Sequence, residues 1–200
     1  MLPVFYPIFD SAQWLERLLP LGIKLVQLRI KDESPDTVKR EIAHAQELTH
    51  QYDCQLIVND YWQEAIEFGC DYVHLGQEDL EGADVKAIKS AGIKLGVSTH
   101  SEGELDTALS VNPDYVALGP VYPTILKKMP WQPQGLERVG EWKKAIGDIP
   151  LVAIGGLTLE RAQGVIDAGA DVVSLVTDIT LNPDPEERTR QWVAFQERNS

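Results

Sequence analysis

The feature that most constrains the fold is a regular alternation of short apolar runs with longer amphipathic stretches. The apolar runs predict strands over 3–8, 24–29, 55–59, 72–75, 94–98, 114–118, 151–154 and 172–176. The amphipathic stretches predict helices over 11–20, 34–52, 61–69, 83–91, 101–110, 136–147, 158–168 and 185–197. Strands that are apolar on both faces are typical of parallel sheets covered by helices. The repeated units therefore predict an α/β protein.

Length and spacing favour closure of this sheet into a barrel. Eight units in 200 residues average 25 residues each, which is at the low end for a (β/α)8 TIM barrel. An open doubly wound sheet is the alternative, but the chain shows no clear point at which the strand order would reverse. We expect a single TIM-barrel domain over residues 1–200.

Charge and composition limit the partners. A net charge of −13 argues against nucleic acid, which binds basic surfaces, and against anionic membrane surfaces. The apolar residues 1–9 lack a basic segment and are too short to span a membrane.

Cys54 and Cys70 have no metal or redox spacing and are expected to be reduced. The cytoplasm is the expected location. The oligomeric state stays open, with a homo-oligomer as one alternative.

Polar or glycine residues close most of the predicted strands, although a packed core does not require them there. They are Gln27, Arg29 and Lys31 at the second strand, Asn59 and Asp60 at the third, Asp79 in the loop after the fourth, Ser98 at the fifth, Gly119 and Pro120 at the sixth, and Gly155 and Gly156 at the seventh. Parallel strands end on one face of a barrel, where active sites form. We predict one active site on that face.

Gln27, Arg29 and Lys31 alternate along one side of the second predicted strand, and apolar residues occupy the other side. The apolar side must face the helices, so the three polar side chains should point toward the barrel axis. Because unpaired buried cations are costly, an anionic ligand such as a phosphorylated metabolite is the expected partner. A salt-bridged core layer is the alternative.

Asp60 and Asp79 follow neighbouring strands and place two carboxylates at the same rim. Two acidic ligands are too few for a calcium cage. They suit Mg²⁺, which keeps several waters and takes further oxygens from a substrate phosphate. The alternative is that Asp79 only caps the following helix.

Gly155 and Gly156 precede a predicted helix, and Val176 and Thr177 follow the eighth strand. Barrels often bind a phosphate through backbone N–H groups of these two loops. The sequence therefore predicts a second phosphate site there.

The connection over 119–135 is much longer than the usual loop of a βα unit. It carries Lys127 and Lys128, and we expect it to close over an anionic substrate. A tolerated insertion is the alternative. Among the histidines, His74 on the fourth strand is read as a core residue with a satisfied hydrogen bond, and the role of His100 stays open.

Six segments resemble the thiamine phosphate synthase family in order and spacing. They are Gln27–Lys31, Asn59–Tyr61, His74–Asp79, Gly96–His100, Ala117–Thr124 and Val152–Gly156. The resemblance extends along nearly the full length of the chain. The resemblance implies a TIM barrel that joins 4-amino-2-methyl-5-hydroxymethylpyrimidine diphosphate to 4-methyl-5-(2-phosphoethyl)thiazole, giving thiamine phosphate and diphosphate.

The resemblance also implies a role for each matching residue. Mg²⁺ would be bound by Asp60 and Asp79. The catalytic set would be Arg29, Lys31, Lys127 and Ser98. The pyrimidine diphosphate would contact Gln27, Arg29, Lys31, Asn59, Ser98 and Lys127. The thiazole phosphate would contact Thr124, Gly156, Val176 and Thr177. Leu126 stands where the family often has a second threonine.

The family's reaction is similar to a dissociative displacement in which diphosphate leaves first. Such a reaction needs no side-chain nucleophile, and we find no Ser-His-Asp or Cys-His set. Two alternatives remain: a thiazole tautomerase, which has no use for a diphosphate site, and a non-catalytic barrel that binds thiazole phosphate. Retention of the predicted metal and diphosphate residues favours the synthase.

Overall fold

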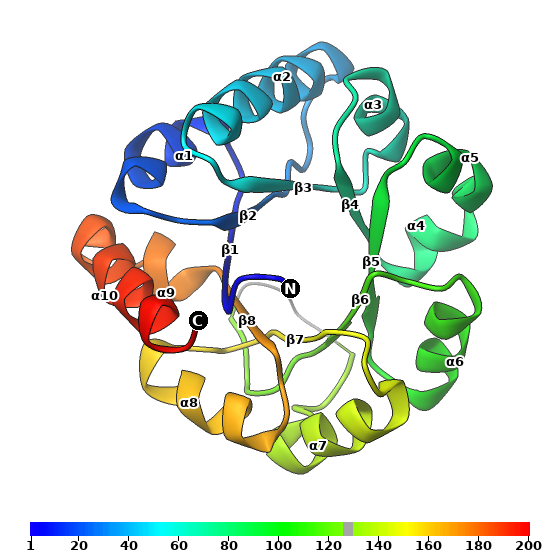
Figure 1. The fold of residues 1–200 in the computed structure, drawn as a ribbon, viewed down its shortest axis with the longest axis vertical. Helices are drawn as coiled ribbons and strands as arrows, with labels where there is room; N and C mark the ends of the chain where they lie inside the picture. The colour runs from blue at the N-terminus through cyan, green and yellow to red at the C-terminus, as the bar shows by residue number, and fades with distance from the viewer. Residues whose placement is uncertain (126–129) are drawn as a thin grey trace.

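The computed structural model describes residues 1–125 and 130–200, in which eight parallel strands form a closed barrel (Figure 1). The strands are β1 (Phe5–Phe9), β2 (Leu25–Leu28), β3 (Gln55–Asn59), β4 (Tyr72–Leu75), β5 (Lys94–Thr99), β6 (Tyr115–Leu118), β7 (Leu151–Ala153) and β8 (Val172–Leu175). Each strand pairs with the next one in sequence, and β8 pairs with β1. The predicted TIM barrel is confirmed.

A ring of helices surrounds the barrel (Figure 1). The helices are α1 (Ala12–Leu18), the 3₁₀ turn η1 (Leu19–Leu21), α2 (Pro35–Gln51), α3 (Trp62–Glu67), α4 (Gln77–Glu81), α5 (Val85–Ser90), α6 (Glu102–Ser110), α7 (Gly135–Ile146), α8 (Leu159–Ala168), α9 (Thr177–Thr180) and α10 (Pro185–Arg198). All eight predicted helices are present. The short helices α4 and α9 were not predicted, because four or five residues are too few to show a helical period.

The core has two layers, as the alternation of side chains along each strand requires. Val26 and Leu28 belong to the layer between the strands and the helices. The barrel interior holds Tyr6, Leu25, Ile57, Tyr72, Tyr115, Ala117, Val152 and Val172. Leu2 packs against this inner cluster, and the N-terminus lies over the middle of the ring in Figure 1. The amino ends of the strands are therefore filled, and ligands must approach from the carboxyl ends.

An ion cluster ties the last three helices together. Asp178, in the first turn of α9, accepts hydrogen bonds from Arg188 Nε at 2.9 Å and from Trp192 Nε1 at 2.8 Å, both on α10. Arg188 also donates to Glu160 of α8 at 2.8 Å. The side chains of Asp178 and Arg188 are only 8% and 13% exposed. This cluster fixes the position of α9 beside β8.

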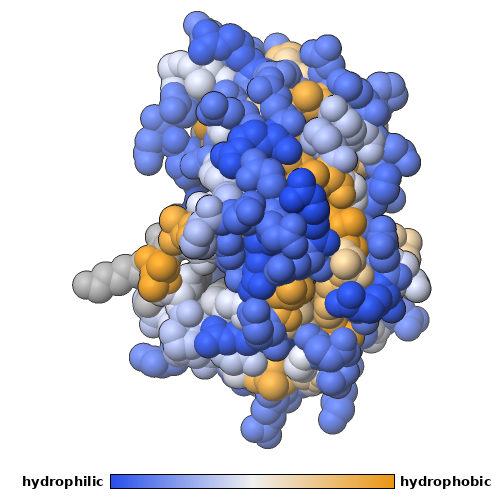
Figure 2. Space-filling view, turned by 90° about the vertical axis from the view of Figure 1, so that its left-hand side faces the viewer, coloured by the Kyte–Doolittle hydropathy of each residue, from blue (hydrophilic) through white to orange (hydrophobic). Residues whose placement is uncertain are grey.

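The surface agrees with the charge balance of the sequence. Seen from the side of α1 and α10, most of the visible surface is hydrophilic (Figure 2). Within the described residues, no helix is long and apolar enough to cross a membrane. Cys54 and Cys70 are free thiols, as expected, and burial raises their pKa values to about 12 and about 11.

Candidate active site

Three charged residues meet where β2, β3 and β4 end. Lys31 forms an ion pair with Asp60, and Asp79 lies close enough for a side-chain hydrogen bond with Asp60. The structure therefore brings together one cation and two carboxylates that the sequence placed at three strand ends. The sequence placed Asp79 in a loop, but in the structure Asp79 is part of the first turn of α4.

The second strand is shorter than predicted. It ends at Leu28, so Arg29 and Lys31 follow the strand and do not close it. The backbone N–H of Arg29 donates to the Phe9 carbonyl at 2.8 Å, and Arg29 is half-buried, whereas Lys31 is exposed. Of these three polar residues, only Gln27 lies in the strand itself, where it is buried with 3% of its surface exposed. Leu28, the last residue of β2, pairs with Val58, and β3 ends one residue later at Asn59. Both strands therefore end at nearly the same level of the sheet.

The backbone of Asp60 has an unusual conformation. Its φ is 68°, in the left-handed region that Asp and Asn tolerate better than most residues. Its N–H donates to the carbonyl of His74 on β4 at 2.9 Å. The left-handed turn directly after β3 therefore fixes where the carboxylate lies, close to Lys31.

The two carboxylates form a group that a divalent cation would stabilise. Burial raises the pKa of Asp79, and the charge and hydrogen bond of Asp60 raise it further, whereas Lys31 lowers it. Two neighbouring anions of this kind repel each other, and Mg²⁺ is commonly bound through one or two carboxylates together with water and substrate oxygens. The donor set fits that ion.

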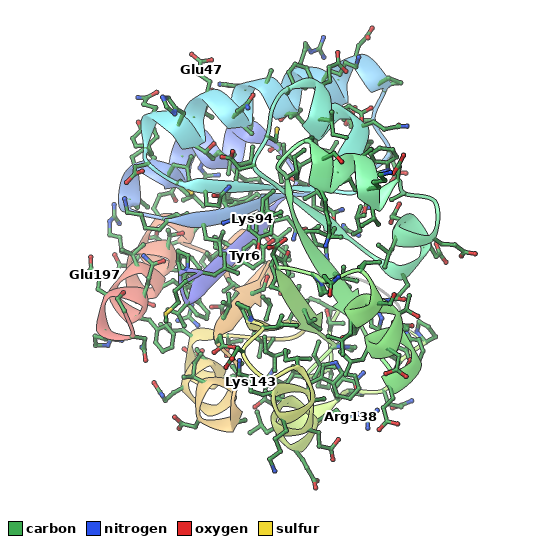
Figure 3. The ribbon with its side chains drawn as sticks, turned by 45° about the vertical axis from the view of Figure 1, so that its right-hand side comes forward. Tyr6, Glu47, Lys94, Arg138, Lys143 and Glu197 are labelled. Atoms are coloured by element: carbon green, nitrogen blue, oxygen red, sulfur yellow. The ribbon has the colours of Figure 1, made fainter. Side chains whose placement is uncertain are left out.

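A chain of polar side chains crosses the barrel interior below this rim. Gln27 Nε2 donates to Tyr6 Oη at 2.8 Å, and Tyr6 Oη lies 2.9 Å from Tyr115 Oη. His74 Nδ1 lies 2.6 Å from Tyr115 Oη, and its Nε2 lies 2.6 Å from Ser98 Oγ. Figure 3 shows Tyr6 in the middle of the barrel, whereas Glu47, Arg138 and Glu197 lie at the periphery. Gln27 and Ser98, which belong to the predicted site, are thus connected.

His74 is a buried residue with both ring nitrogens paired, as predicted. Burial lowers its pKa to about 4, and the nearby Arg29 charge acts in the same direction, while Asp60 opposes it. The imidazole is therefore neutral at physiological pH. Asn59, beside His74 in the β3–β4 register, is also buried.

The loop after β7 packs tightly against the loop after β6. Gly155 and Gly156 have φ values of 105° and 64°. A Cβ atom on Gly156 would lie 2.4 Å from the Pro123 carbonyl oxygen. Only glycine fits this backbone, because both its conformation and its contacts exclude a side chain. Thr124 follows Pro123, so the predicted phosphate residues of the two loops are brought together.

Arg161 joins the same two loops. It is in the first turn of α8, where a cation is unfavourable to the helix dipole. Its Nη1 donates to the Gly156 carbonyl at 2.6 Å, and its guanidinium lies 4.3 Å from the centre of the Tyr122 ring. Val176 and Thr177, on the neighbouring loop, begin helix α9. Lys127 lies outside the described residues.

Comparison with known proteins identifies, over almost the whole chain, the family that the six sequence segments resemble. Residues 5–179 match the family described as thiamine monophosphate synthase. This chain belongs to that family. It is 61% identical to the thiamine-phosphate synthase of Rhizobium etli over 95% of this chain and 93% of that protein. It is 48% identical to the thiamine-phosphate synthase of Citrobacter koseri over 95% and 90% of the two chains. As a member of the thiamine monophosphate synthase family, the protein is an enzyme, a transferase.

Solved structures agree with this membership. The thiamine phosphate pyrophosphorylase of Pyrococcus furiosus superposes with a TM-score of 0.86 at 26% identity, over 98% of this chain and 96% of that one. The 3-hexulose-6-phosphate synthase of Salmonella typhimurium reaches a TM-score of 0.69 at 13% identity, over 98% and 99% of the two chains. The second likeness shows only the shared barrel fold.

Sequence reasoning missed several polar residues in the barrel interior and in the loops around the candidate site. It did not single out Tyr6, Tyr115 or Arg161 as site residues. His100, whose role stayed open, binds Glu104 through Nδ1 at 2.7 Å and stacks on Trp131 at 5.3 Å between ring centres. A polar hydroxyl at an inward-facing position of a strand is the signal that could have identified the two tyrosines.

Proposed function

We propose that the protein joins 4-amino-2-methyl-5-hydroxymethylpyrimidine diphosphate to 4-methyl-5-(2-phosphoethyl)thiazole. The products would be thiamine phosphate and diphosphate. The observation that carries this proposal is the convergence of Lys31, Asp60 and Asp79 at one rim, beside Gln27 and Ser98 of the interior chain. A thiazole tautomerase would not need this charged group, and the relatives that are 61% and 48% identical are thiamine-phosphate synthases.

In the proposed reaction, the bond between the pyrimidine methylene carbon and the diphosphate oxygen breaks first. The oxygen takes the bonding electrons, and the thiazole nitrogen then forms the new C–N bond with the methylene carbon. Arg29, Lys31 and Lys127 would stabilise the negative charge that develops on the leaving diphosphate. The glycine loop around Gly156 would hold the thiazole phosphate through backbone N–H groups.

Asp60 and Asp79 would hold the proposed Mg²⁺. Within residues 1–125 and 130–200, no group of three or more His, Cys, Asp or Glu side chains could bind a metal ion by itself. The remaining oxygens would therefore come from water and from the substrate. When bound, Mg²⁺ would neutralise part of the charge on the diphosphate.

The test is to mix both precursors with the purified protein and Mg²⁺, and to follow thiamine phosphate and diphosphate. We expect equal amounts of both products and loss of the reaction when a chelator removes the metal. Isomerisation of the thiazole without any thiamine phosphate would instead support a tautomerase. Binding of thiazole phosphate without turnover would support the non-catalytic alternative.

Replacement of Lys127 by alanine should raise the KM for the pyrimidine diphosphate about tenfold or more, because a cation on a phosphate contributes more than a kcal/mol. The matched control is Lys128→Ala, since Lys128 is the adjacent cation of the same connection and has no assigned ligand. Steady-state kinetics with each substrate varied in turn would measure both. An equal loss in thiazole phosphate binding would contradict the assigned role.

Replacement of Arg161 by alanine should raise the KM for the thiazole phosphate about fivefold. The change removes a hydrogen bond to Gly156 and a cation–π contact to Tyr122, which together are worth about 1 kcal/mol at an exposed site. Arg190→Ala is the matched control, because Arg190 is an exposed arginine of α10 that pairs with Glu187. A larger effect on the pyrimidine diphosphate would argue against this placement.

A further inference from the structure

One unbroken chain of hydrogen bonds runs through the barrel interior and links five strands. It passes from Gln27 on β2 to Tyr6 on β1, Tyr115 on β6, His74 on β4 and Ser98 on β5. Gln27, Tyr6, Tyr115 and His74 are at least nine-tenths buried. The two ends, Gln27 and Ser98, are residues that the proposed function places at the pyrimidine substrate.

The protons of this chain can be counted. The amide nitrogen of Gln27 can only donate, each hydroxyl has one proton, and a neutral imidazole has one N–H and one acceptor nitrogen. Gln27 Nε2 donates to Tyr6. The remaining protons can then be arranged in three orders along the chain. The first order places the His74 proton on Nε2, and the other two place it on Nδ1.

In the first order, every buried donor has an acceptor. Tyr6 donates to Tyr115, and Tyr115 donates to His74 Nδ1. The His74 proton is then on Nε2 and is donated to Ser98 Oγ. The hydroxyl proton of Ser98 is left over at the half-buried end of the chain, where it faces no acceptor among the described residues.

In the second order, the directions reverse and one buried proton is stranded. Ser98 would donate to His74 Nε2, His74 Nδ1–H to Tyr115, and Tyr115 to Tyr6. Tyr6 would accept from both Gln27 and Tyr115, and its own proton would have no acceptor. Tyr6 is 1% exposed, so water does not reach it. In the third order, Tyr115 would accept from both Tyr6 and His74 Nδ1–H, and the proton of the fully buried Tyr115 would have no acceptor. Buried donors in native proteins are almost always paired, which disfavours both orders with the proton on Nδ1.

We propose that this chain fixes His74 as the Nε2–H tautomer and makes Ser98 a hydrogen-bond donor toward the ligand. The site then selects a ligand with an acceptor atom opposite Ser98. The identity of that atom rests on the proposed function, under which it is a ring nitrogen of the aminopyrimidine. Tyr6, Tyr115 and His74 are positioning residues, because they act on the substrate only through Ser98 and Gln27.

The tautomer can be measured without any substrate. Long-range ¹H–¹⁵N spectra of the ¹⁵N-histidine protein distinguish the two neutral tautomers, and His74→Gln assigns the signals. We expect Nε2–H in the unmodified protein and in Tyr6→Phe, since Tyr115 can still donate to Nδ1 there. Tyr115→Phe removes that donor and should shift His74 away from a pure Nε2–H state. An Nδ1–H tautomer in the unmodified protein overturns the proposal, as does an unaltered His74 spectrum in Tyr115→Phe.

The direction of the Ser98 hydrogen bond is tested with inhibitors. Two pyridine analogues of the pyrimidine, each with one ring nitrogen replaced by C–H, would be compared as competitive inhibitors. One of them should bind the unmodified protein about tenfold more weakly than the parent and should lose that difference in Ser98→Ala. Equal affinity of both analogues for the unmodified protein overturns the proposal. Absence of thiamine phosphate synthesis with an Nε2–H tautomer would refute the proposed function alone.

Discussion

Replacement of Asp60 by asparagine should lower kcat/KM about a thousandfold. The proposed Mg²⁺ site would lose one of its two carboxylates, and a metal that stabilises a leaving anion contributes several kcal/mol. Asparagine keeps the shape of the side chain and tolerates the left-handed backbone of residue 60, where φ is 68°. The fold should therefore survive, and the loss should be in the chemistry. Steady-state kinetics over a range of Mg²⁺ concentrations would measure it.

Asp53 provides a matched control for this experiment. It is also an aspartate with a left-handed backbone, with φ at 51°, but it precedes β3, whereas Asp60 follows it. Asp53→Asn should change kcat/KM by less than about twofold, because an exposed pair such as the one with Lys24 contributes little. If Asp60→Asn kept the Mg²⁺ dependence of the unmodified protein, the carboxylate would serve only to pair Lys31.

Replacement of Gly96 by alanine should destabilise the fold by about 3 kcal/mol. A Cβ atom on Gly96 would lie 2.0 Å from Cζ of Tyr115. The Tyr115 ring is fully buried in the barrel interior and is held by Tyr6 and His74, so it cannot move aside. For a chain of this size we expect the melting temperature to fall by roughly 6–12 °C. Calorimetry or thermal circular dichroism would measure it.

Gly103 is the matched control. It lies in α6, and no atom would approach an added Cβ within 4 Å. Gly103→Ala should raise stability slightly, by up to about 1 kcal/mol, because alanine favours a helix. The double variant Gly96→Ala with Tyr115→Ala should be less destabilised than the sum of the two single changes. Additive losses would show that the Tyr115 ring is not the obstacle.

The strands and long helices were predictable because each repeats a short chemical pattern. The predicted range of β3 is the observed one, and β4 is also predicted without error. At β2, however, alternation suggested that the strand continued to Arg29, whereas the structure ends it at Leu28. Alternation reports which side chains share a face, and it does not report where hydrogen bonding to a neighbouring strand stops.

The candidate site was predicted at the level of strand ends but not of contacts. Parallel topology alone places Asp60 and Asp79 at the same rim. It could not show that Asp79 is part of a five-residue helix. Nor could it show the contact between Tyr6 and Tyr115, which are separated by 109 residues. A tyrosine within an apolar run resembles any other packing residue until its hydroxyl partner is known.

Closure of the barrel has a consequence for synthesis of the chain. Among the described residues, β1 pairs in the sheet with β2 and β8 alone, and Phe5 pairs in register with Val173. One edge of the first strand therefore stays open during translation until the last strand has left the ribosome. Open strand edges attract other chains, and contacts between distant residues form slowly. We expect growing chains that stop before residue 172 to aggregate or to recruit chaperones, whereas a chain that includes β8 closes the barrel.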